Sequence, residues 1–412
     1  MLELTGVSVL AQETSAHHGW DPRYGVWKPE VRKRDGRKVE RGQLALPTMK
    51  RAAALEVKPC RLLWRGPGGL GDSLGNVSFE TLLAMRQLGM QVHFEPLNPW
   101  SVPSELAHDE RIADVVNMRL QAPTDVDVEI QIPGLTSAKI RPCLAYYFNE
   151  FGSTRDLPDA DAFWVSSRFI QQRLREVVPE DRIVLAPHGV NTSLFQFNRR
   201  PHATQHDRPF RFLYVGTTNS RKGIDLLLQA WQRQRNHLPD AELVMKISPT
   251  SLGFIWKAIY EQGTRIRVFT MPMLPRELAA WIQTCDVVVA PSRAEAFGLT
   301  VLEAMACGLP AIIPFGSAMD EFCPDEACFH VSSEEVRITV AGSERELSFV
   351  EPDLDSLCEC MMRAHAERDR LPQMGAIARE AAQLFSWSNV TRVLLSQVQA
   401  RYGSRMVIER SQ

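Results

Sequence analysis

The stretch SRAEAFGLTVLEAMACGLP, residues 292–310, decides the fold prediction. It follows a short apolar run that predicts a buried strand at residues 287–290, and it continues into a predicted helix at residues 299–306. The intervening loop carries Glu295, and the first turn of the helix carries Glu303. In parallel α/β sheets such a loop lies at the carboxyl end of a strand, where carboxylates and unpaired helix amides are offered to one ligand.

The same alternation of short apolar runs with helix-length stretches continues on both sides of this unit and predicts parallel sheets covered by helices. Strands are predicted at residues 60–65, 91–95, 126–132, 143–147, 163–166, 183–186, 210–215, 242–247, 266–269, 287–290 and 311–314, and helices at 73–88, 167–177, 224–235, 252–261, 276–284 and 299–306. The polar stretch 198–209 divides them into two doubly wound, Rossmann-like lobes. Two such lobes would face each other across an interdomain cleft.

Length and composition agree with an ordinary globular protein of two or three domains. The 412 residues are 44% hydrophobic and 23% charged, with a formal charge of −2, which excludes a disordered chain and gives no global attraction to nucleic acid. Residues 28–51 form a local exception, with nine basic and three acidic side chains. This segment is either a solvated extension or an arm for peripheral contact with anionic lipid or a partner.

Targeting and metal signals are weak. The N-terminus lacks a secretory pattern, no apolar run is long enough to span a bilayer, and the eight cysteines have no zinc spacing, so we expect a cytoplasmic protein without a bound metal. Asp125 and Asp127 spell a DxD pattern, but they lie in an alternating run and are predicted to share one face of a strand.

Two glycine-rich turns follow predicted first strands. Gly66 to Gly71 satisfy GxGxxG with Glu95 ending the next strand, which leaves three interpretations open: a simple turn, a phosphate or sugar contact, or an NAD or FAD site. Gly216 to Gly223 carry Arg221 and Lys222, which could neutralise a departing diphosphate or could be solvated surface charges.

Two further charged groups have competing explanations. Lys246 ends a neighbouring predicted strand, so it could point to the same cleft edge. Thr300 and Glu303 fit a capping box, in which Glu303 would only stabilise the helix start. Glu295 has no comparable structural explanation.

Residues 295–303 resemble the E-x7-E signature of retaining glycosyltransferases of the GT-B fold, family 4. The surrounding EAFGLTVLEAMACGLPAI, the stretch FRFLYVGTTNSRKGIDLLLQAW and the segment PHGVNTSLF are similar to the same family, whereas ELVMKIS, FVEPDLDSL and FSWSNVTRVL agree more weakly. The resemblance spans roughly residues 60–402 and is most specific in the second half.

The resemblance implies a site for a nucleoside diphosphate sugar, held mainly by the second lobe. It assigns the diphosphate to Arg221 and Lys222, the ribose to Glu303 and the donor sugar to Glu295. It adds donor contacts at Gly69, Leu70, Gly71, Gly216, Lys246, Phe297, Gly298, Leu299 and Thr300. Many relatives have an arginine where this chain has Thr217.

The expected activity is metal-independent glycosyl transfer with retention, without a cofactor, to a saccharide, lipid-linked or other acceptor. Glu150 and His188 are candidate acceptor residues, and each could equally be structural. The alternatives are an epimerase or phosphorylase-like GT-B enzyme, an NAD- or FAD-dependent oxidoreductase, and an inactive sugar-nucleotide binding module.

The predicted organisation has five parts. They are a partly disordered extension (1–56), an acceptor-side lobe (57–197), a linker (198–209), a donor-binding lobe (210–385) and a C-terminal helix crossing back to the first lobe (386–412).

Overall fold

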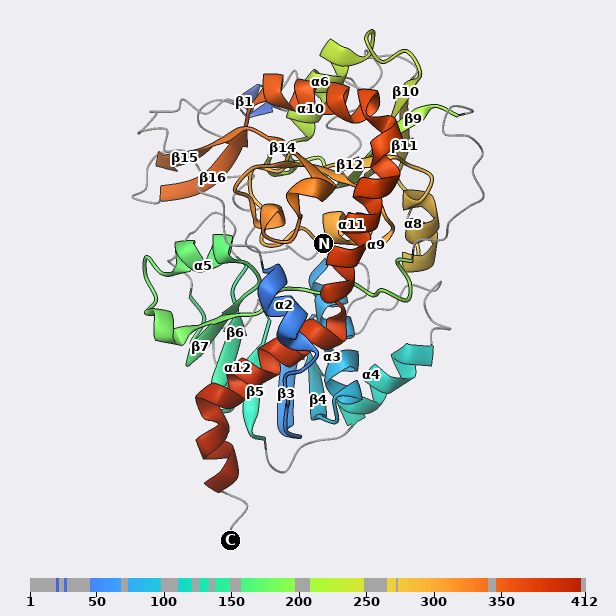
Figure 1. The fold of residues 1–412 in the computed structure, drawn as a ribbon. Helices are drawn as coiled ribbons and strands as arrows, with labels where there is room; N and C mark the ends of the chain where they lie inside the picture. Colours follow the sequence, from blue (N-terminus) through green and yellow to red (C-terminus); the bar gives the residue numbers. More distant parts are fainter. Residues whose placement is uncertain are drawn as a thin grey trace.

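Two lobes, each built on a parallel six-stranded sheet, make up the body of the protein (Figure 1). The structure is a computed structural model that describes residues 20–21, 26–27, 45–67, 73–97, 110–120, 126–132, 138–148, 157–196, 208–247, 265–271, 273–339 and 346–408. The predicted α/β class, with two doubly wound lobes, is confirmed.

The first lobe has the strand order β4-β3-β5-β6-β7-β8. Its strands are β3 (Arg61–Gly66), β4 (Gln91–Pro96), β5 (Val128–Gln131), β6 (Cys143–Tyr146), β7 (Ala162–Val165) and β8 (Ile183–Leu185), and its helices are α3 (Ser73–Gln87), α4 (Glu110–Leu120) and α5 (Arg168–Leu174). All residues of β5, β6 and β7 are buried, as expected for central parallel strands covered on both faces.

The second lobe has the order β11-β10-β9-β12-β13-β14, and the order reverses between β9 and β12. Its strands are β9 (Phe210–Gly216), β10 (Ala241–Ile247), β11 (Ile266–Phe269), β12 (Val287–Val289), β13 (Ala311–Pro314) and β14 (Cys328–Val331), and its helices are α6 (Ile224–Gln234), α8 (Pro275–Ile282), α9 (Leu299–Ala306), α10 (Leu354–Ala366) and α11 (Leu371–Leu384). Ligands of open α/β sheets bind at such a reversal, outside the carboxyl ends of the strands. A ligand site is therefore expected at the loops after β9 and β12.

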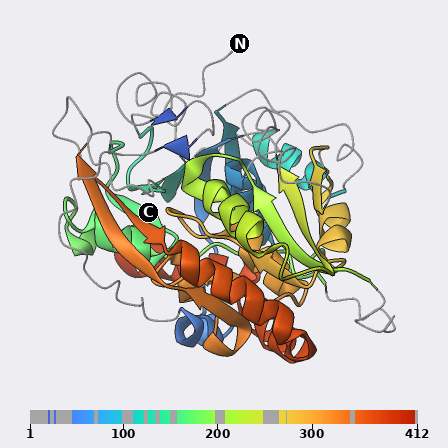
Figure 2. The ribbon, with the colours of Figure 1, turned by 90° about the horizontal axis from the view of Figure 1, so that it is seen from above.

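A hairpin projects from one side of the second lobe (Figure 2). It consists of β15 (Ser333–Thr339) and β16 (Glu346–Pro352), paired antiparallel. The hairpin reaches the first lobe at α5, where the Arg173 guanidinium lies over the Phe169 ring at 3.6 Å and donates a hydrogen bond to Ser348 Oγ at 3.3 Å. The two lobes therefore touch on the hairpin side.

The last helix, α12 (Trp387–Ile408), runs from the second lobe across the first (Figure 1). Gln397 Nε2 donates to the Leu185 carbonyl at 2.6 Å, and Gln399 Nε2 donates to the Lys58 carbonyl at 2.6 Å. Among the described helices, α12 included, none has the length and hydropathy needed to cross a membrane.

The N-terminal region contains structure that the sequence pattern did not indicate. A two-residue pair, β1 (Trp20–Asp21) and β2 (Val26–Trp27), and the helix α2 (Leu46–Ala52) fall within residues 1–56. Met49 on α2 is only 1% exposed, because α2 packs against α11 and α12. Most of the basic segment, residues 28–44, lies outside the described residues.

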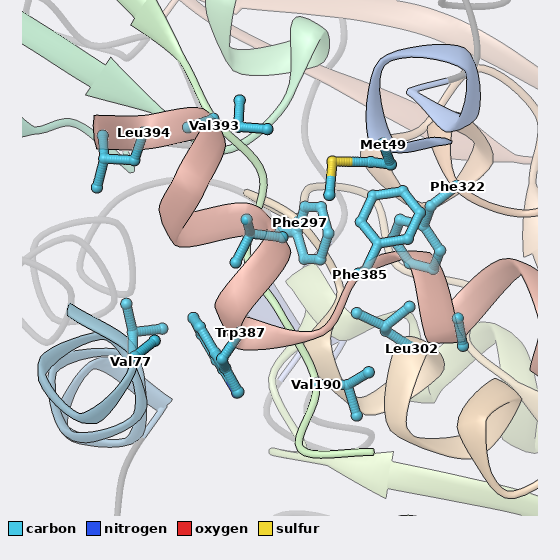
Figure 3. Packing of buried hydrophobic residues seen from close by; sticks show 14 of the residues in the cluster. Met49, Val77, Val190, Phe297, Leu302, Phe322, Phe385, Trp387, Val393 and Leu394 are labelled. Atoms are coloured by element: carbon cyan, nitrogen blue, oxygen red, sulfur yellow. The ribbon is translucent and has the colours of Figure 1, made fainter. Parts of the chain in front are cut away.

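One hydrophobic cluster extends through both lobes. Figure 3 shows Phe297 and Phe322 of the second lobe beside Phe385, Trp387 and Met49. The same cluster continues into the strands of the first lobe. The lobes therefore share a core at the place where the chain passes between them, which limits the freedom of each lobe to move alone.

Several predicted elements have the bounds that the structure gives, namely those at 266–269, 299–306 and 311–314. The predicted helix at 252–261 lies outside the described residues. Of the predicted linker 198–209, only Arg208 and Pro209 are described, and Arg208 forms a 2.6 Å ion pair with Asp286. The described strands and helices that were not predicted are β1, β2, α2, α4, β14, the β15–β16 hairpin, α10 and α11.

Truncation of Met49 tests whether α2 is part of the shared core. Met49→Ala should lower the free energy of unfolding by about 2–5 kcal/mol, because it removes buried methylene groups and leaves a cavity. Urea denaturation measures the change. Met271→Ala, at a position that is 73% exposed, serves as the matched control and should change the same quantity by less than about 0.5 kcal/mol. Equal, small effects of both substitutions would contradict the packing of α2.

Candidate functional site

The loop after β9 is drawn tightly against the end of β12. Residues Ser220–Lys222 form a 3₁₀ turn, capped by the Asn219 side chain, which accepts from the Lys222 amide at 3.2 Å. Gly223 follows with φ of +68°, and a Cβ atom there would lie 1.9 Å from the Pro291 carbonyl oxygen. Only glycine allows this approach, so the turn is fixed beside the loop that carries Glu295.

Arg221, Lys222 and Glu295 form one ionic cluster between these two loops. Lys222 Nζ donates to both carboxylate oxygens of Glu295, at 2.7 Å to Oε2, and Arg221 Nη1 donates to Oε2 at 3.2 Å. Glu295 is 9% exposed. The sequence analysis predicted that all three residues belong to one site, and the structure brings them into direct contact.

The charge state of Glu295 follows from a competition. Burial raises the pKa of this carboxyl group, but attraction to Lys222 and Arg221 and their hydrogen bonds outweigh it and hold the pKa below its ordinary value. Glu295 is therefore ionised at neutral pH, and its negative charge lies where an anionic ligand of the two cations would compete with it.

Arg293 fixes the loop on the second lobe. Its guanidinium donates to both oxygens of Asp225, at 2.7 and 2.9 Å, and to both oxygens of Glu351, also at 2.7 and 2.9 Å. A further hydrogen bond of 2.6 Å reaches the Ser220 carbonyl, and the Arg293 amide donates to the Arg221 carbonyl at 2.8 Å. The turn with the cations and the loop with Glu295 are thereby tied together.

Ala296 and Phe297, which follow Glu295 in the loop, contact the first lobe. The Ala296 carbonyl accepts hydrogen bonds from Ser166 Oγ at 3.0 Å and from Ser167 Oγ at 2.7 Å. The Phe297 ring lies 5.4 Å from the imidazole of His188, centroid to centroid. Successive residues of one loop are thus held by both lobes.

The helix α9 begins in a way that excludes the capping box. Its N-cap is Gly298 with φ of +104°, so Thr300 is already inside the helix and the Thr300–Glu303 capping interpretation is wrong. A Cβ atom at Gly298 would lie 2.4 Å from Met319 Cγ, which makes glycine necessary at this turn. Leu299 and Thr300 form the first turn, as expected.

Glu303 lies on α9 near a second carboxylate rather than in the ionic cluster. Burial, and then repulsion from Glu80 on α3 of the first lobe, raise the pKa of Glu303 to about 8. Glu80 itself accepts from Arg111 Nη1 at 2.9 Å and from Asn191 Nδ2 at 3.1 Å. Glu303 has no hydrogen bond to another described side chain, so it remains available to a hydroxyl-bearing ligand.

The remaining predicted donor residues are only partly accounted for. Gly216 ends β9, and Lys246 lies near the end of the neighbouring β10, where burial lowers its pKa. Gly69, Leu70 and Gly71 lie outside the described residues. The same holds for the acceptor candidate Glu150.

His188 lies inside the molecule at the junction of the lobes. It is 4% exposed and surrounded by the rings of Tyr146, Trp164, Phe297 and Trp387, with centroids 5.2–6.2 Å away. Burial lowers its pKa to about 3, so the ring is neutral. In this arrangement His188 packs between the lobes and is shielded from an acceptor in solvent.

Two carboxylates from the other sequence patterns are paired within the first lobe, namely Asp127 of the DxD pattern and Glu95 after the GxGxxG turn. Asp125 lies outside the described residues. Asp127 accepts from the Arg61 amide at 2.8 Å, and both oxygens of Glu95 accept from Lys139 Nζ at 2.8 Å. Within the described ranges, no group of three or more His, Cys, Asp or Glu side chains is arranged to hold a metal ion.

Sequence reasoning missed the residues that hold the loop. Arg293 had a usable signal, because it adjoins Glu295 in the quoted motif. Ser166, Ser167 and Glu80 had none, since each acts on the second lobe from a distant part of the chain.

The raised pKa of Glu303 predicts a pH-dependent effect of substitution. A carboxyl group whose pKa is raised on folding favours the folded state most at a pH below its unfolded pKa. This contribution to the free energy of unfolding is lost as the pH rises through the folded pKa of about 8. The side chain of Glu303→Gln stays neutral at every pH. The difference in free energy of unfolding, variant minus wild type, should therefore increase from pH 5.5 to pH 9. Denaturation at both pH values measures this difference, and an equal difference at both would contradict the assignment.

The second lobe matches a known family. The model of the family described as "Glycosyl transferases group 1" matches residues 195–341. D-inositol 3-phosphate glycosyltransferase of Paenarthrobacter aurescens is 36% identical over 141 residues, covering 32% of this chain and 35% of that protein. Lipopolysaccharide 1,2-N-acetylglucosaminetransferase of Salmonella typhimurium is 25% identical over 256 residues, covering 58% and 62%. The chain thus spans about a third of the D-inositol 3-phosphate glycosyltransferases that it matches.

Solved structures match over both lobes. A glycosyltransferase from Rickettsia africae has a TM-score of 0.60 at 14% identity, covering 84% of this chain and 99% of that one. Anabaena HepE in complex with UDP and glucose has a TM-score of 0.57 at 12% identity, covering 83% and 100%. At such identities the likeness concerns the fold, which is GT-B. The chain therefore has the GT-B fold, and its residues 195–341 are similar to the glycosyl transferases group 1 family.

Proposed function

We propose that this protein transfers a sugar from a nucleoside diphosphate sugar to an acceptor, with retention of anomeric configuration. The observation that carries the proposal is the contact of Arg221 and Lys222 with Glu295 at the strand-order reversal of the second lobe. Two cations suit a diphosphate, and a buried, ionised carboxylate beside them suits a sugar that develops positive charge.

The chemistry assigns each group a role. The bond between the anomeric carbon and the diphosphate oxygen breaks, the acceptor hydroxyl oxygen bonds to the anomeric carbon, and the hydroxyl proton leaves with the diphosphate. Negative charge grows on the leaving oxygen as its bond breaks, and Arg221 and Lys222 stabilise it. Glu295 exchanges the cations for the donor sugar when the donor binds, and during the reaction it orients hydroxyl groups or stabilises oxocarbenium character. Glu303, with its pKa raised to about 8, hydrogen-bonds the ribose hydroxyls. No metal ion or cofactor has a role in this scheme.

Other parts of the proposal rest on the resemblance and on relatives' names. Retention follows the E-x7-E resemblance of residues 295–303. The relatives' names mention inositol phosphate and lipopolysaccharide, which supports a saccharide, polyol phosphate or lipid-linked acceptor. We further propose a cytoplasmic setting, with at most peripheral membrane contact through residues 28–51.

The rival functions differ in their requirements. An epimerase or phosphorylase-like enzyme would convert the sugar nucleotide without this acceptor, and an oxidoreductase would bind NAD or FAD. An inactive binding module would bind the donor and catalyse nothing. A thermal-shift screen of UDP- and GDP-sugars against NAD and FAD separates the oxidoreductase from the enzymes and modules that bind sugar nucleotides, because a ligand of the folded state raises the melting temperature. Product formation with and without an acceptor then separates the transferase from the epimerase or phosphorylase-like enzyme and from the inactive module. Proton NMR of the product's anomeric coupling then tests retention.

Removal of Lys222 tests the proposed leaving-group contact. Lys222→Ala should raise the barrier by about 2–4 kcal/mol, which lowers kcat/KM roughly 30- to 1,000-fold. Arg233→Ala, which removes an exposed cation on α6, is the control and should retain activity. Wild-type turnover in Lys222→Ala, with an active donor identified, would remove Lys222 from the mechanism.

Neutralising Glu295 should separate binding from turnover. Glu295→Gln removes the carboxylate that competes for the cations, so inorganic diphosphate should bind roughly ten-fold more tightly by calorimetry. Turnover should nevertheless fall, because the donor sugar loses its ionised partner. Glu242→Gln makes the same change of charge against Arg211 and Arg267 at the amino end of β10, and as the control it should leave diphosphate affinity unchanged. Unchanged diphosphate affinity in Glu295→Gln would contradict the competition.

A further inference from the structure

The loop that carries Glu295 belongs to the second lobe, as do Arg221 and Lys222, but part of it is held by the first lobe. Ser166 and Ser167 directly follow β7 of the first lobe, and both hydroxyls donate to the carbonyl of Ala296, the residue after Glu295. Both serines are 1% exposed. A carbonyl oxygen has two lone pairs, so this pair of donors fills its capacity.

A second contact between the lobes lies next to the first. The Glu321 carboxylate of the second lobe accepts from the Arg168 and Phe169 amides at 2.8 Å each. The Glu321 carbonyl also accepts from the Ala45 amide at 2.8 Å. Residues 166–169 of the first lobe are therefore held at consecutive positions by the second lobe.

The two restraints on Glu295 respond differently to a donor. Its carboxylate is held by Lys222 and Arg221, and these are the cations that a diphosphate would engage. When a diphosphate engages both cations, the backbone beside Glu295 keeps its own contacts. The hydrogen bonds that it receives from the first lobe are those of the Ser166 and Ser167 hydroxyls to the Ala296 carbonyl.

We propose that Ser166 and Ser167 are positioning residues for Glu295, so that contact of the first lobe completes the sugar-facing part of the site on the second. This inference rests on the proposed glycosyl transfer. The inference separates two quantities. Donor affinity depends mainly on second-lobe groups, and turnover depends on the position of Glu295 relative to the sugar.

The double variant Ser166→Ala/Ser167→Ala tests the inference in the full chain. The Kd for the donor should stay within about two-fold of the wild type, whereas kcat should fall roughly ten- to a hundred-fold, because a small displacement of a reacting group is costly. Ser166→Thr/Ser167→Thr keeps both hydroxyls and should restore most of the activity.

Hydrogen exchange provides a readout that needs no substrate. In the unliganded double variant, amide exchange over residues 293–300 should accelerate roughly ten-fold, since two buried hydrogen bonds are lost. Glu321→Gln, which leaves both serines in place, should accelerate the same stretch and replaces the double variant if that variant does not fold.

The serine substitutions remove two hydroxyl donors and, at Ser167, the N-cap of α5, whose Oγ accepts from the Ile170 amide at 3.2 Å. Two controls match these losses. Ser396→Ala deletes a hydroxyl that donates to the Val393 carbonyl at 2.9 Å within α12, and Asp353→Ala deletes the N-cap of α10, whose carboxylate accepts from the Ser356 amide at 2.7 Å. Both should leave exchange over residues 293–300 unchanged.

The two proposals fail in different ways. Unchanged exchange over residues 293–300 would overturn the positioning inference whatever the activity, and so would a loss of donor affinity equal to the loss of kcat. Accelerated exchange in the double variant would support the link between the lobes even if the wild-type protein transferred no sugar from any donor. The absence of transfer would overturn the proposed function.

Discussion

The ion pairing of Glu295 with Arg221 and Lys222 is the interaction on which the site depends. Three charges with little exposure are tolerable only because they satisfy one another, and their geometry requires the two loops to stay in contact. Gly223 permits that contact by having no Cβ atom, and Arg293 secures it through Asp225 and Glu351. The backbone and the charges thus impose the same arrangement.

The arrangement also depends on how the lobes meet. Phe297 packs into the shared core beside Phe385, and Ala296 is held by the first lobe, so the loop is a junction as well as a binding element. The buried His188, also at this junction, has the character of a packing group. A site built in this way couples the positions of the lobes to the position of one carboxylate.

The sequence was sufficient for the local features and insufficient for the distant ones. The helix at 299–306 was predictable, because apolar periodicity acts over a few residues. Arg221 and Lys222 lie 74 and 73 positions from Glu295, and their grouping was predictable from the family resemblance and from the position of both loops at the carboxyl ends of parallel strands. The capping interpretation of Glu303 failed because Gly298, with a positive φ, starts the helix earlier than Thr300 would. The serine contacts join residues about 130 positions apart, and a single sequence carries no signal of such pairing.

In the proposed reaction a diphosphate replaces Glu295 as the partner of Arg221 and Lys222. A crystal structure with an intact nucleoside diphosphate sugar would show this exchange. Phosphate oxygens should lie within hydrogen-bond distance of Lys222 Nζ and Arg221, with the Glu295 carboxylate turned to the sugar. A bound diphosphate held elsewhere, with the ion pairs of Glu295 intact, would contradict this exchange.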